Sequence, residues 1–462
     1  MGTIGPASST PEVVDRLVTI GLDAARLNFS HGTRDDHAAR AELIRGAQKR
    51  AGRPLALIAD LQGPKIRVGK LSAPLELPTG GEVIVTGEGV PGPGSLPVSP
   101  AVLTDVLEVG QDVLIDDGLV RLRVEEVMNG SARCSVVVGG PVGSQKGVNV
   151  PGVGIPVPSL TDKDLEDLEF ALELGVDWVA LSFVRSANDC RNLREHLNEA
   201  GARALVIAKI EKAEALEELD AIISASDAVM VARGDLGTEI GPAAVPLVQK
   251  RIISAALERG KPAITATQML ESMLNHPEPT RAEASDVANA ILDGTSAVML
   301  SGETAVGRYP VESVEYMDRI ARAVEPSLPY RHELARAADQ PFPTVGEAMS
   351  NAACDIAEVL GAAAICVPTY SGRTASEVAR HRPRRPIIAA THRRHAVQQM
   401  AIEWGVVPVE IEECKDVEDL WARSLEAARE TGLVQPGDRV VITAGTAVNV
   451  PGTTNVIKVE TA

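Results

Sequence analysis

The feature that most constrains this chain is a regular alternation of short apolar runs with amphipathic segments, from the first residues to about residue 325. Apolar runs separated by helices are typical of strands that are buried on both faces of a parallel sheet. With the stub GTIG there are eight such runs, and eight in series predict a closed (β/α)8 TIM barrel. The other seven runs are AARLNFSHG, PLALIADLQGP, VDWVALSFV, ALVIAKI, DAVMVARGD, PAITATQ and SAVMLSGE.

Two further regions differ from this pattern. Between residues 68 and 155 the helical periods vanish, and short alternating runs such as EVIVTG and LVRLRVEEV predict a small β-barrel domain inserted after the third strand. Beyond about residue 330 apolar runs and helices alternate again, as in AAAICVPT, RPIIAAT and VVITAG. We therefore expect an α/β protein with a (β/α)8 barrel over residues 1–67 and 156–328, an inserted β domain over 68–155 and a C-terminal α/β domain over 329–462.

Composition narrows the classes of function. A formal net charge of −18 and an aromatic content of 2% disfavour nucleic acid and anionic membranes as partners. Five scattered cysteines without CxxC pairing fit reduced thiols in a cytosol. No apolar stretch approaches the roughly 18 residues of a membrane span, and the amino terminus lacks the basic and apolar regions of a signal peptide. We expect a cytoplasmic protein with neither kind of partner.

Polar residues gather where the predicted strands end, which is where a barrel places its active site. In VIAKIEK, Lys209 and Glu211 are two residues apart, so on a strand both side chains project from one face. A lysine and a glutamate together at a barrel mouth could clamp a phosphate and ligate a magnesium ion. The alternative is a surface ion pair.

The same reasoning applies to the next two strand ends. Asp235 follows a fully apolar strand and is preceded by Gly234, whose backbone N–H can approach an anion. Magnesium usually takes one or two protein carboxylates, the number that Glu211 and Asp235 supply. Thr267 ends the following strand. The alternatives here are an RGD tripeptide in an ordinary loop and a threonine that caps a helix.

The second predicted strand adds one cation and several polar groups. ARLNFSHG places Arg26 and Asn28 on one strand face, followed by Ser30 and His31. Arginine suits bidentate contacts to phosphate, although NFSHG could equally be a turn.

The third predicted strand ends in ADLQGPKIRVG. Here Asp60 closes the apolar run, and two cations, Lys65 and Arg67, follow a Gly-Pro break. No Walker loop or GxGxxG loop offers a competing phosphate site.

Taken together, these motifs resemble those of the pyruvate kinase family, in its bacterial type. The resemblance covers the barrel almost end to end and includes the inserted domain, while YSGRTA and GTAVNVPGTTN extend it through the C-terminal region. The strings that carry it are GTIGPAS, ARLNFSHG, ADLQGPKIR, DDGL, KGVNVPG, ALSFVR, KIEK, VMVARGDLG, PLVQKRII, ATQMLESM, PTRAEASDVANAILDG and MLSGETAVGRYP.

The resemblance implies transfer of the phosphoryl group of phosphoenolpyruvate to ADP, followed by protonation of the enolate, in the last step of glycolysis. It also implies that the inserted domain is a lid, that the C-terminal domain is regulatory, and that the protein is an allosteric homotetramer using Mg²⁺ or Mn²⁺. On matching positions, the implied catalytic residues are Lys209, Thr267 and Arg26, and the implied substrate-binding residues are Arg26, Lys209, Gly234, Asp235 and Thr267. The implied metal ligands are Glu211 and Asp235, and the implied nucleotide contacts are Asn28, His31, Arg67 and Lys146.

In the C-terminal region TYSGRTA resembles the family's effector-phosphate loop. A sugar phosphate or AMP would be the effector, held by hydroxyl and backbone N–H groups at the start of a helix. The alternative is an ordinary capped helix start. The implied effector residues are Thr369, Ser371, Gly372, Arg373 and Thr374, and we expect Trp421 and Arg423 to line the same pocket.

The third-strand motif occurs in two forms in the family, and the form with leucine, glutamine and lysine goes with independence from potassium. This chain has Leu61, Gln62 and Lys65 and so resembles that form. A lysine ammonium is a compact monovalent cation, so we expect Lys65 to replace the ion and K⁺ not to be required. The positions that match potassium ligands elsewhere are Asn28, Ser30 and Asp60.

Two departures from the family pattern stand out. The usual longer first strand is reduced to Thr3 and Ile4 before GPAS, which could cost stability where the barrel closes, and Ser186 replaces a lysine that follows SFVR in many relatives. Three other hypotheses remain at this point: another phosphoenolpyruvate enzyme with the same fold, a non-catalytic paralogue, and a structural scaffold.

Overall fold

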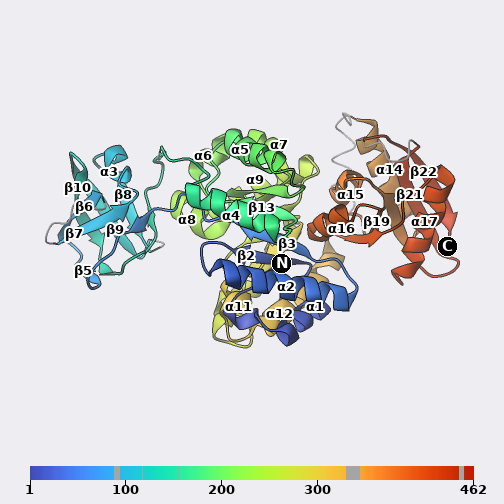
Figure 1. The fold of residues 1–462 in the computed structure, drawn as a ribbon, viewed down its shortest axis with the longest axis horizontal. Helices are drawn as coiled ribbons and strands as arrows, with labels where there is room; N and C mark the ends of the chain where they lie inside the picture. The colour runs from blue at the N-terminus through green and yellow to red at the C-terminus, as the bar shows by residue number, and fades with distance from the viewer. Residues whose placement is uncertain (88–93, 117, 155, 329–343, 447–451) are drawn as a thin grey trace.

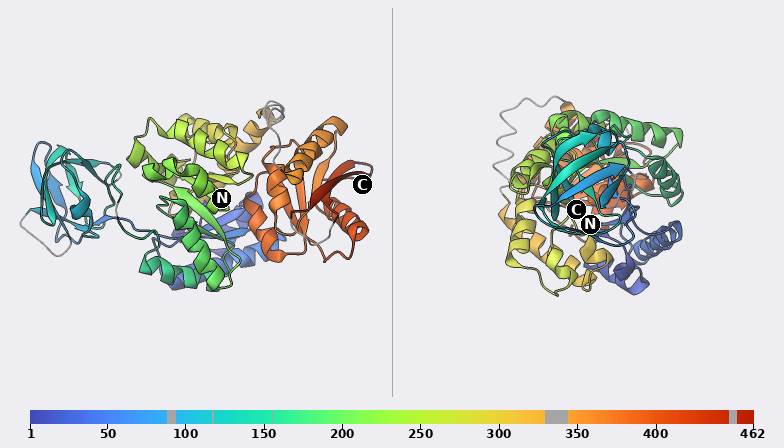
Figure 2. Two further views of the ribbon diagram at one scale, coloured as in Figure 1. Left: turned by 90° about the horizontal axis from the view of Figure 1, so that it is seen from above. Right: turned by 90° about the vertical axis from the view of Figure 1, so that its left-hand side faces the viewer.

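The computed structural model describes residues 1–87, 94–116, 118–154, 156–328, 344–446 and 452–462. It confirms the expected fold and shows three domains in a row, with the (β/α)8 barrel between the inserted β domain and the C-terminal α/β domain (Figure 1, Figure 2). The expected domain boundaries at 155 and 329 and the middle of the GTAVNVPGTTN loop, residues 447–451, lie outside the described residues.

The barrel strands are parallel and follow the order β1-β2-β3-β13-β14-β15-β16-β17. The two-residue β1 closes the barrel, because Thr3 N donates to Leu300 O and Leu300 N donates to Met1 O, each at 3.0 Å. Each of the eight apolar runs in the sequence supplies one strand. Their bounds are β1 (Gly2–Thr3), β2 (Ala24–Asn28), β3 (Ala56–Asp60), β13 (Trp178–Leu181), β14 (Leu205–Ile210), β15 (Ala228–Ala232), β16 (Ala263–Ala266) and β17 (Ala297–Met299).

Helices surround these strands and bury a large apolar core between the two layers. Several begin with a capping box, in which Thr33, Thr161 or Thr280 accepts from a backbone N–H of the first turn. The barrel helices are α1 (Pro11–Ile20), α2 (Arg34–Ala51), α4 (Asp162–Glu173), α5 (Ala187–Glu199), α6 (Ala213–Glu217), α7 (Leu219–Ala225), α8 (Arg233–Ile240), α9 (Val245–Glu258), α10 (Arg281–Leu292), α11 (Gly302–Ala305) and α12 (Pro310–Val324).

The inserted domain, which we call the lid, has a core of its own. Alternate residues of its strands, such as Val83, Val85, Leu122 and Val124, are buried against one another, so the domain does not depend on the barrel for its packing. Its main sheet has the order β12-β8-β9-β10-β6-β7-β4. The strands are β4 (Arg67–Val68), β6 (Glu82–Gly87), β7 (Ser95–Ser99), β8 (Asp112–Ile115), β9 (Val120–Met128), β10 (Ser131–Val138) and β12 (Val148–Asn149), beside the pair β5 (Leu75–Leu77) and β11 (Gly140–Val142).

The C-terminal domain is a sheet of order β20-β19-β18-β21-β22, covered by helices. Only β22 runs antiparallel to its neighbour in the described sheet. The elements are α14 (Val345–Leu360), β18 (Ala364–Pro368), α15 (Arg373–Ala379), β19 (Ile387–Thr391), α16 (Arg394–Gln399), β20 (Val406–Glu410), α17 (Val417–Glu430), β21 (Arg439–Gly445) and β22 (Thr454–Thr461).

This domain contacts the barrel where the strands begin. Leu55 N, just before β3, donates to Gln398 Oε1 at 3.1 Å, and Trp178 Nε1, at the start of β13, donates to Gln399 O at 3.2 Å. Ile402 packs with the apolar side chains inside the barrel. The C-terminal domain therefore closes the amino end of the barrel and leaves the carboxyl end to the lid.

Two observations bear on the environment of the chain. Among the described helices, none is both long and apolar enough to cross a membrane. The five cysteines are buried and free, and burial raises the pKa of the Cys134, Cys190 and Cys366 thiols to about 12. These thiols are therefore protonated and poorly nucleophilic at neutral pH.

Candidate active site

Lys209, near the end of β14, lies at the centre of a charged cluster at the carboxyl end of the barrel. Its Nζ lies 3.0 Å from Glu211 Oε1 and 3.2 Å from Asp60 Oδ1, and it donates to Ser182 Oγ at 2.7 Å. The spacing of Lys209 and Glu211 thus has the predicted effect, since both side chains project from one face into the same cluster. A surface ion pair is excluded, because only 11% of the Lys209 side chain is exposed.

The Asp60 carboxylate joins this lysine to a second cation. Arg26 Nε donates to Asp60 Oδ2 at 2.6 Å, and another guanidinium nitrogen donates to Thr3 Oγ1 at 2.9 Å. Asp60 ends β3 and Arg26 lies on the neighbouring β2, so adjacent strands hold the pair in place. One buried carboxylate therefore holds Arg26 and Lys209 a few ångströms apart.

The pKa values of this cluster follow from burial and from the opposite charges beside each group. Burial alone would raise the pKa of Asp60, but Arg26 and Lys209 hold it below the usual value. Burial alone would lower the pKa of Lys209, but Asp60 and Glu211 hold it above its usual value. Lys209 and Asp60 are therefore both charged at neutral pH.

Glu211 and Asp235 form the carboxylate side of the cluster. Burial, together with the nearby charge of Asp235, raises the pKa of Glu211 in spite of Lys209. Glu211 Oε2 accepts from Phe183 N at 2.7 Å, and Asp235 Oδ1 lies 3.6 Å from Lys65 Nζ. Within the described residues, no third carboxylate, histidine or cysteine gathers with them as a metal cluster. Two carboxylates fit a magnesium ion that takes its remaining ligands from substrate and water.

The segment RGD is not a loop, because β15 runs directly into α8. Arg233 is the first residue of that helix, and Asp235 lies in its first turn. Gly234 N, which the sequence suggested for an anion, donates here to Thr267 Oγ1 at 3.0 Å. The structure therefore places Gly234, Asp235 and Thr267 together at the ends of adjacent strands.

Arg233 holds the Thr267 segment in an unusual conformation. The φ angles of Thr267 and Gln268 are 68° and 53°, in the left-handed region that residues with a Cβ rarely adopt. The Arg233 guanidinium donates to Thr267 O at 2.6 Å and to Gln268 O at 3.0 Å. It also pairs with Asp286 at 2.6 Å. These bonds offset the backbone strain and fix the position of the threonine hydroxyl.

The residues assigned to nucleotide lie at the mouth of the barrel and in the adjoining lid. His31 lies at the surface. Partial desolvation lowers its pKa, and the positive charges of Arg67 and Lys65 lower it further. The Arg67 guanidinium donates to Gln145 O at 3.0 Å in the lid, and Lys146 pairs with Asp116 at 2.9 Å. The structure thus brings the charges of Arg67 and Lys65 close to His31, whereas the Lys146 ammonium is paired within the lid.

The proposed monovalent-cation positions also lie close together. Asn28 Oδ1 accepts from Ser30 N at 3.2 Å, and both Asp60 oxygens contact cations. The Leu61 side chain is fully buried in the apolar core and offers no oxygen.

Sequence reasoning missed two residues of the site, Ser182 and Arg233. Ser182 Oγ accepts from Lys209 and donates to Leu61 O at 2.7 Å, so it links β13 to β3 and orients the lysine. In the sequence it is one small polar residue within ALSFVR. Arg233 could have been noticed as a cation directly after an apolar strand, but its partners become visible only when β15 and β16 are paired.

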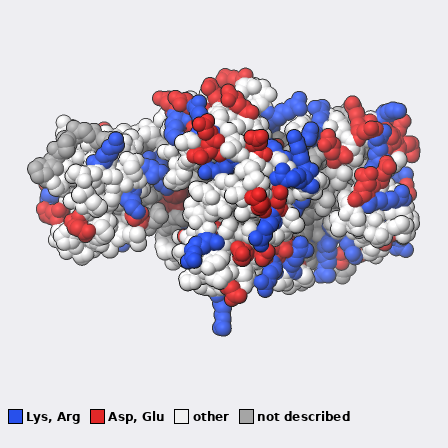
Figure 3. All heavy atoms as spheres, turned by 60° about the horizontal axis from the view of Figure 1, so that its bottom comes forward, with Lys and Arg blue, Asp and Glu red and all other residues white. Residues whose placement is uncertain are grey.

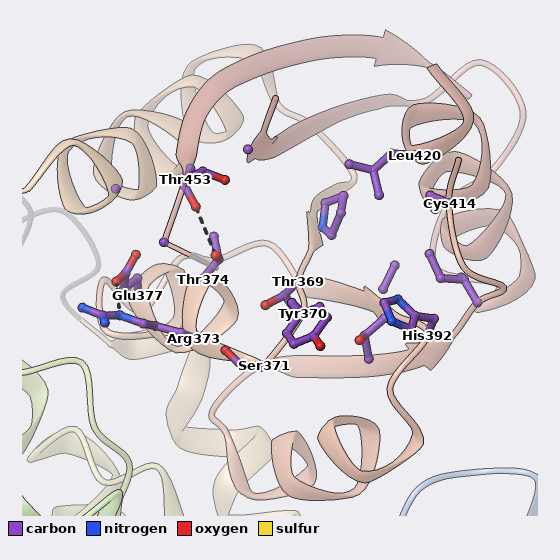
Figure 4. Close-up of a pocket in the computed structure, with 18 of the residues that line it drawn as sticks. Thr369, Tyr370, Ser371, Arg373, Thr374, Glu377, His392, Cys414, Leu420 and Thr453 are labelled. Carbon is purple, nitrogen blue, oxygen red and sulfur yellow. Dashed lines mark hydrogen bonds and ion pairs between the residues drawn. The ribbon is translucent and has the colours of Figure 1, made fainter. Parts of the chain in front are cut away.

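The effector motif lines a cavity of about 370 Å³ in the C-terminal domain. Figure 4 shows Arg373 and Thr374 at one end of this cavity and His392 at the other, with Tyr370 between them. Gly372 has a φ of 90° and a Cβ there would lie 2.9 Å from Met400, so glycine is required at this turn. Gly372 N donates to Thr369 Oγ1 at 3.0 Å.

The expectation that Trp421 and Arg423 line this cavity is wrong. Neither is among its lining residues, which include Leu420 from the same helix. The Arg423 guanidinium instead pairs with Glu412 at 2.8 Å and Asp419 at 2.9 Å, so local carboxylates hold it at the surface of α17.

Comparisons with known proteins agree along the whole chain. Residues 1–314 match the family model described as "Pyruvate kinase, barrel domain", and residues 347–460 match "Pyruvate kinase, alpha/beta domain". The chain is 45% identical over 465 residues to a pyruvate kinase of Agrobacterium vitis, covering 100% of this chain and 98% of the relative. It is 43% identical over 462 residues to that of Clostridium acetobutylicum, covering 99% and 98%. It is also 44% identical over 463 residues to that of Geobacillus stearothermophilus, covering 99% of this chain and 79% of the relative.

Proposed function

The chain belongs to the pyruvate kinase family, and on this premise we propose how it transfers the phosphoryl group of phosphoenolpyruvate to ADP. The observation that carries the proposal is the Asp60 carboxylate held between Arg26 and Lys209. In the free enzyme Asp60 keeps both cations ordered and charged. When substrate binds, the transferring phosphoryl group would take their unused donors, and its charge would be neutralised among buried side chains.

The carboxylates beside Lys209 suit a divalent metal. We assign Glu211 and Asp235 as the ligands of Mg²⁺ or Mn²⁺. When bound, the metal would neutralise phosphate and carboxylate oxygens of the substrates. Lys65 and Lys209 neutralise the same two carboxylates in the free protein, which keeps the ligands in place at little electrostatic cost.

The remaining assignments follow the positions of the side chains. Gly234, Asp235 and Thr267 would bind the substrate. The Thr267 hydroxyl accepts from Gly234 N, and Arg233 braces its backbone, so this hydroxyl would lie on the side from which the enolate receives its proton. The rim residues Asn28, His31, Arg67 and Lys146 would contact the nucleotide phosphates.

A coupled assay tests the function as a whole. Turnover of phosphoenolpyruvate with ADP and Mg²⁺, followed through lactate dehydrogenase, is the expected result. Absence of turnover would favour a non-catalytic paralogue or a structural scaffold. Turnover of phosphoenolpyruvate without formation of ATP would favour a different enzyme with this fold.

We further propose that Lys65 replaces the potassium ion on which some relatives depend. Support comes from the 3.6 Å distance between Lys65 Nζ and Asp235 Oδ1 and from the apolar Leu61. Support also comes from Asp60, whose oxygens already contact cations. A tethered ammonium in this cluster supplies one positive charge without a bound ion.

Activity in a buffer with tetramethylammonium as the only monovalent cation is therefore expected to lie within about threefold of that with potassium. Lys65→Met is expected to lower kcat/KM in that buffer by about tenfold or more, because a charge beside the phosphates is lost. Lys70→Met, which removes an exposed lysine of the lid, is the matched control. A steep potassium requirement of the wild type would contradict the proposal.

The cavity of Figure 4 supports a regulatory site for a sugar phosphate or AMP. We assign Thr369, Ser371, Gly372, Arg373 and Thr374 to the effector phosphate. Arg373 is 73% exposed and pairs only with Glu377 among the described residues, so its guanidinium is free to turn toward a ligand.

Fructose bisphosphate, other sugar phosphates or AMP are expected to lower KM for phosphoenolpyruvate, and Arg373→Gln is expected to weaken that response by about tenfold, since a charge-assisted phosphate contact is lost. The KM without effector should stay unchanged. If no phosphate compound alters KM in the wild type, the regulatory assignment is removed.

By family likeness we also propose that the enzyme is a cytoplasmic homotetramer that acts in the last step of glycolysis. Sedimentation equilibrium of the full chain measures the oligomeric state directly.

A further inference from the structure

A second cavity, of about 530 Å³, lies at the junction of the barrel and the C-terminal domain. We call it the junction cavity. Helix α2 and the residues before β14 line it on the barrel side, and the residues from β19 into α16 line it on the other side. On the face in Figure 3, Lys and Arg side chains gather along this junction. The basic lining residues include Arg45, Lys49, Arg203, Arg393, Arg394 and His395.

The charge of this cavity is not compensated. Among the described residues that line it, Asp177 is the only carboxylate, and it pairs with Arg45 at 2.9 Å. Within the part of the chain that the structure describes, no carboxylate pairs with the other basic lining residues, Lys49, Arg203, Arg393 and Arg394. A group of unpaired cations is notable in a chain of net charge −18, because carboxylates are in excess over the surface as a whole.

Hydrogen bonds between the domains make the base of the cavity rigid. Gln398 Oε1 accepts from Leu55 N at 3.1 Å, and Gln399 Nε2 donates to Arg203 O at 2.7 Å. Arg45 is also fixed, since it donates to Gly175 O at 2.8 Å and to the Asp177 carboxylate. The cavity is therefore formed before any ligand binds.

Arg393 lies between this cavity and the effector cavity. Its guanidinium carbon is 4.0 Å from the centre of the Tyr370 ring, and its Nε is buried without a hydrogen-bond partner among the described residues. Tyr370 lines the effector cavity, and His392 lines both cavities. A buried guanidinium nitrogen without an acceptor is costly, so an anion that reaches it would gain a strong hydrogen bond.

The pKa of His395, which lines the junction cavity, is a second indication of positive electrostatic potential there. Burial lowers the pKa of His395, and the charges of Arg203 and Arg393 lower it further. The contributions of Arg203 and Arg393 indicate a positive electrostatic potential at His395, which favours an anion.

The size and the charge of the cavity together define the class of ligand. Its volume lies in the range of sites for small organic molecules, well above that of inorganic phosphate. Guanidinium groups recognise phosphoryl oxygens in pairs, and several unpaired cations suit more than one phosphoryl group. A long nucleic acid would extend beyond this concave site onto the surface of a chain of net charge −18, which disfavours it.

We propose that the junction cavity is a second anion site, which binds a small organic molecule with two or more phosphoryl groups and bridges α2 to α16. It is separate from the effector loop of Arg373, and it does not depend on turnover. Because Arg393 stacks on Tyr370, an occupant of the junction cavity would also contact the wall of the effector cavity.

Titration calorimetry without substrates tests the proposal on the full chain. The probes are tripolyphosphate as a bare polyanion, fructose bisphosphate as a sugar ligand and adenosine bisphosphate as a nucleoside ligand. We expect at least one to bind, and the double variant Lys49→Gln/Arg394→Gln to weaken its Kd by about tenfold or more. Both side chains are exposed, so the fold should tolerate the change. Arg373→Gln is the matched control, which should weaken only binding in the effector cavity and change the Kd of the junction cavity by less than about twofold.

Three results would overturn the proposal. The first is no binding of any probe to the wild type. The second is equal binding to the wild type and the double variant. The third is that all binding of the probes is lost in Arg373→Gln and retained in the double variant, which would place the anion only in the effector cavity. Which of the sugar and nucleoside probes binds more tightly identifies the source of the phosphoryl groups.

Discussion

Lys209→Met is expected to lower kcat for phosphoryl transfer by about 10³-fold or more and to change KM for phosphoenolpyruvate by less than about threefold. The ammonium is buried, charged and held by Asp60, Glu211 and Ser182, so it meets the transferring group in a fixed position. Such a group stabilises charge that develops in the transition state, whereas Arg26 and the metal ligands remain to bind the ground state. Steady-state kinetics in the coupled assay measures both constants.

The substitution also removes a cation from two buried carboxylates, so its effect on folding needs a control. Lys212→Met is a matched variant, because Lys212 also pairs with a buried carboxylate, that of Glu239, and 12% of its side chain is exposed. We expect similar shifts of Tm in the two variants and a loss of kcat only in Lys209→Met. Near-normal turnover of a folded Lys209→Met enzyme would refute the assignment of this lysine.

Glu211→Gln is expected to weaken the binding of Mn²⁺ by about 100-fold, since it removes one of two charged ligands of a hard divalent cation. A fall in kcat/KM of similar size should accompany it, and raised metal concentrations should recover part of the activity. Electron paramagnetic resonance of free Mn²⁺ measures the affinity without turnover. Glu239→Gln, which neutralises a comparably buried carboxylate, is expected to leave the affinity unchanged.

The pKa of Glu211 gives this prediction a pH dependence. Burial and the charge of Asp235 raise that pKa, so protons compete with the metal at a higher pH than they would at an ordinary glutamate. The affinity of the wild type for Mn²⁺ should therefore fall as the pH is lowered toward that pKa, and the fall should be smaller in Glu211→Gln. Identical pH profiles for the two proteins would show that Glu211 is not a ligand.

The fold could be predicted from the sequence because apolar runs and helical periods report burial directly. The same physics placed Lys209 beside Glu211, since residues two apart on a strand share a face. Arg26 and Asp60 were also recognisable as strand-end groups, although their 2.6 Å contact depends on the register of β2 against β3.

Other parts of the site depend on pairings that local sequence does not contain. The Arg233 brace requires β15 to lie beside β16 and α8 to begin without a loop. The junction cavity requires α16 to reach the amino end of the barrel through Gln398 and Gln399. The misplacement of Arg423 has a different cause, because two carboxylates near it in the sequence, Asp419 on the same helix and Glu412 just before it, hold its guanidinium away from the cavity.

The C-terminal domain closes one end of the barrel, and the reaction chemistry gathers at the opposite end. The strands between them, from Leu55 to Asp60 or from Trp178 to Ser182, are held by hydrogen bonds on both sides. This separation gives the enzyme two distinct surfaces. If the proposed anion sites bind their ligands, substitutions in them would change which ligands control the enzyme while the strand ends that hold Lys209 and Glu211 stay the same, so lineages could acquire new control of an unchanged reaction.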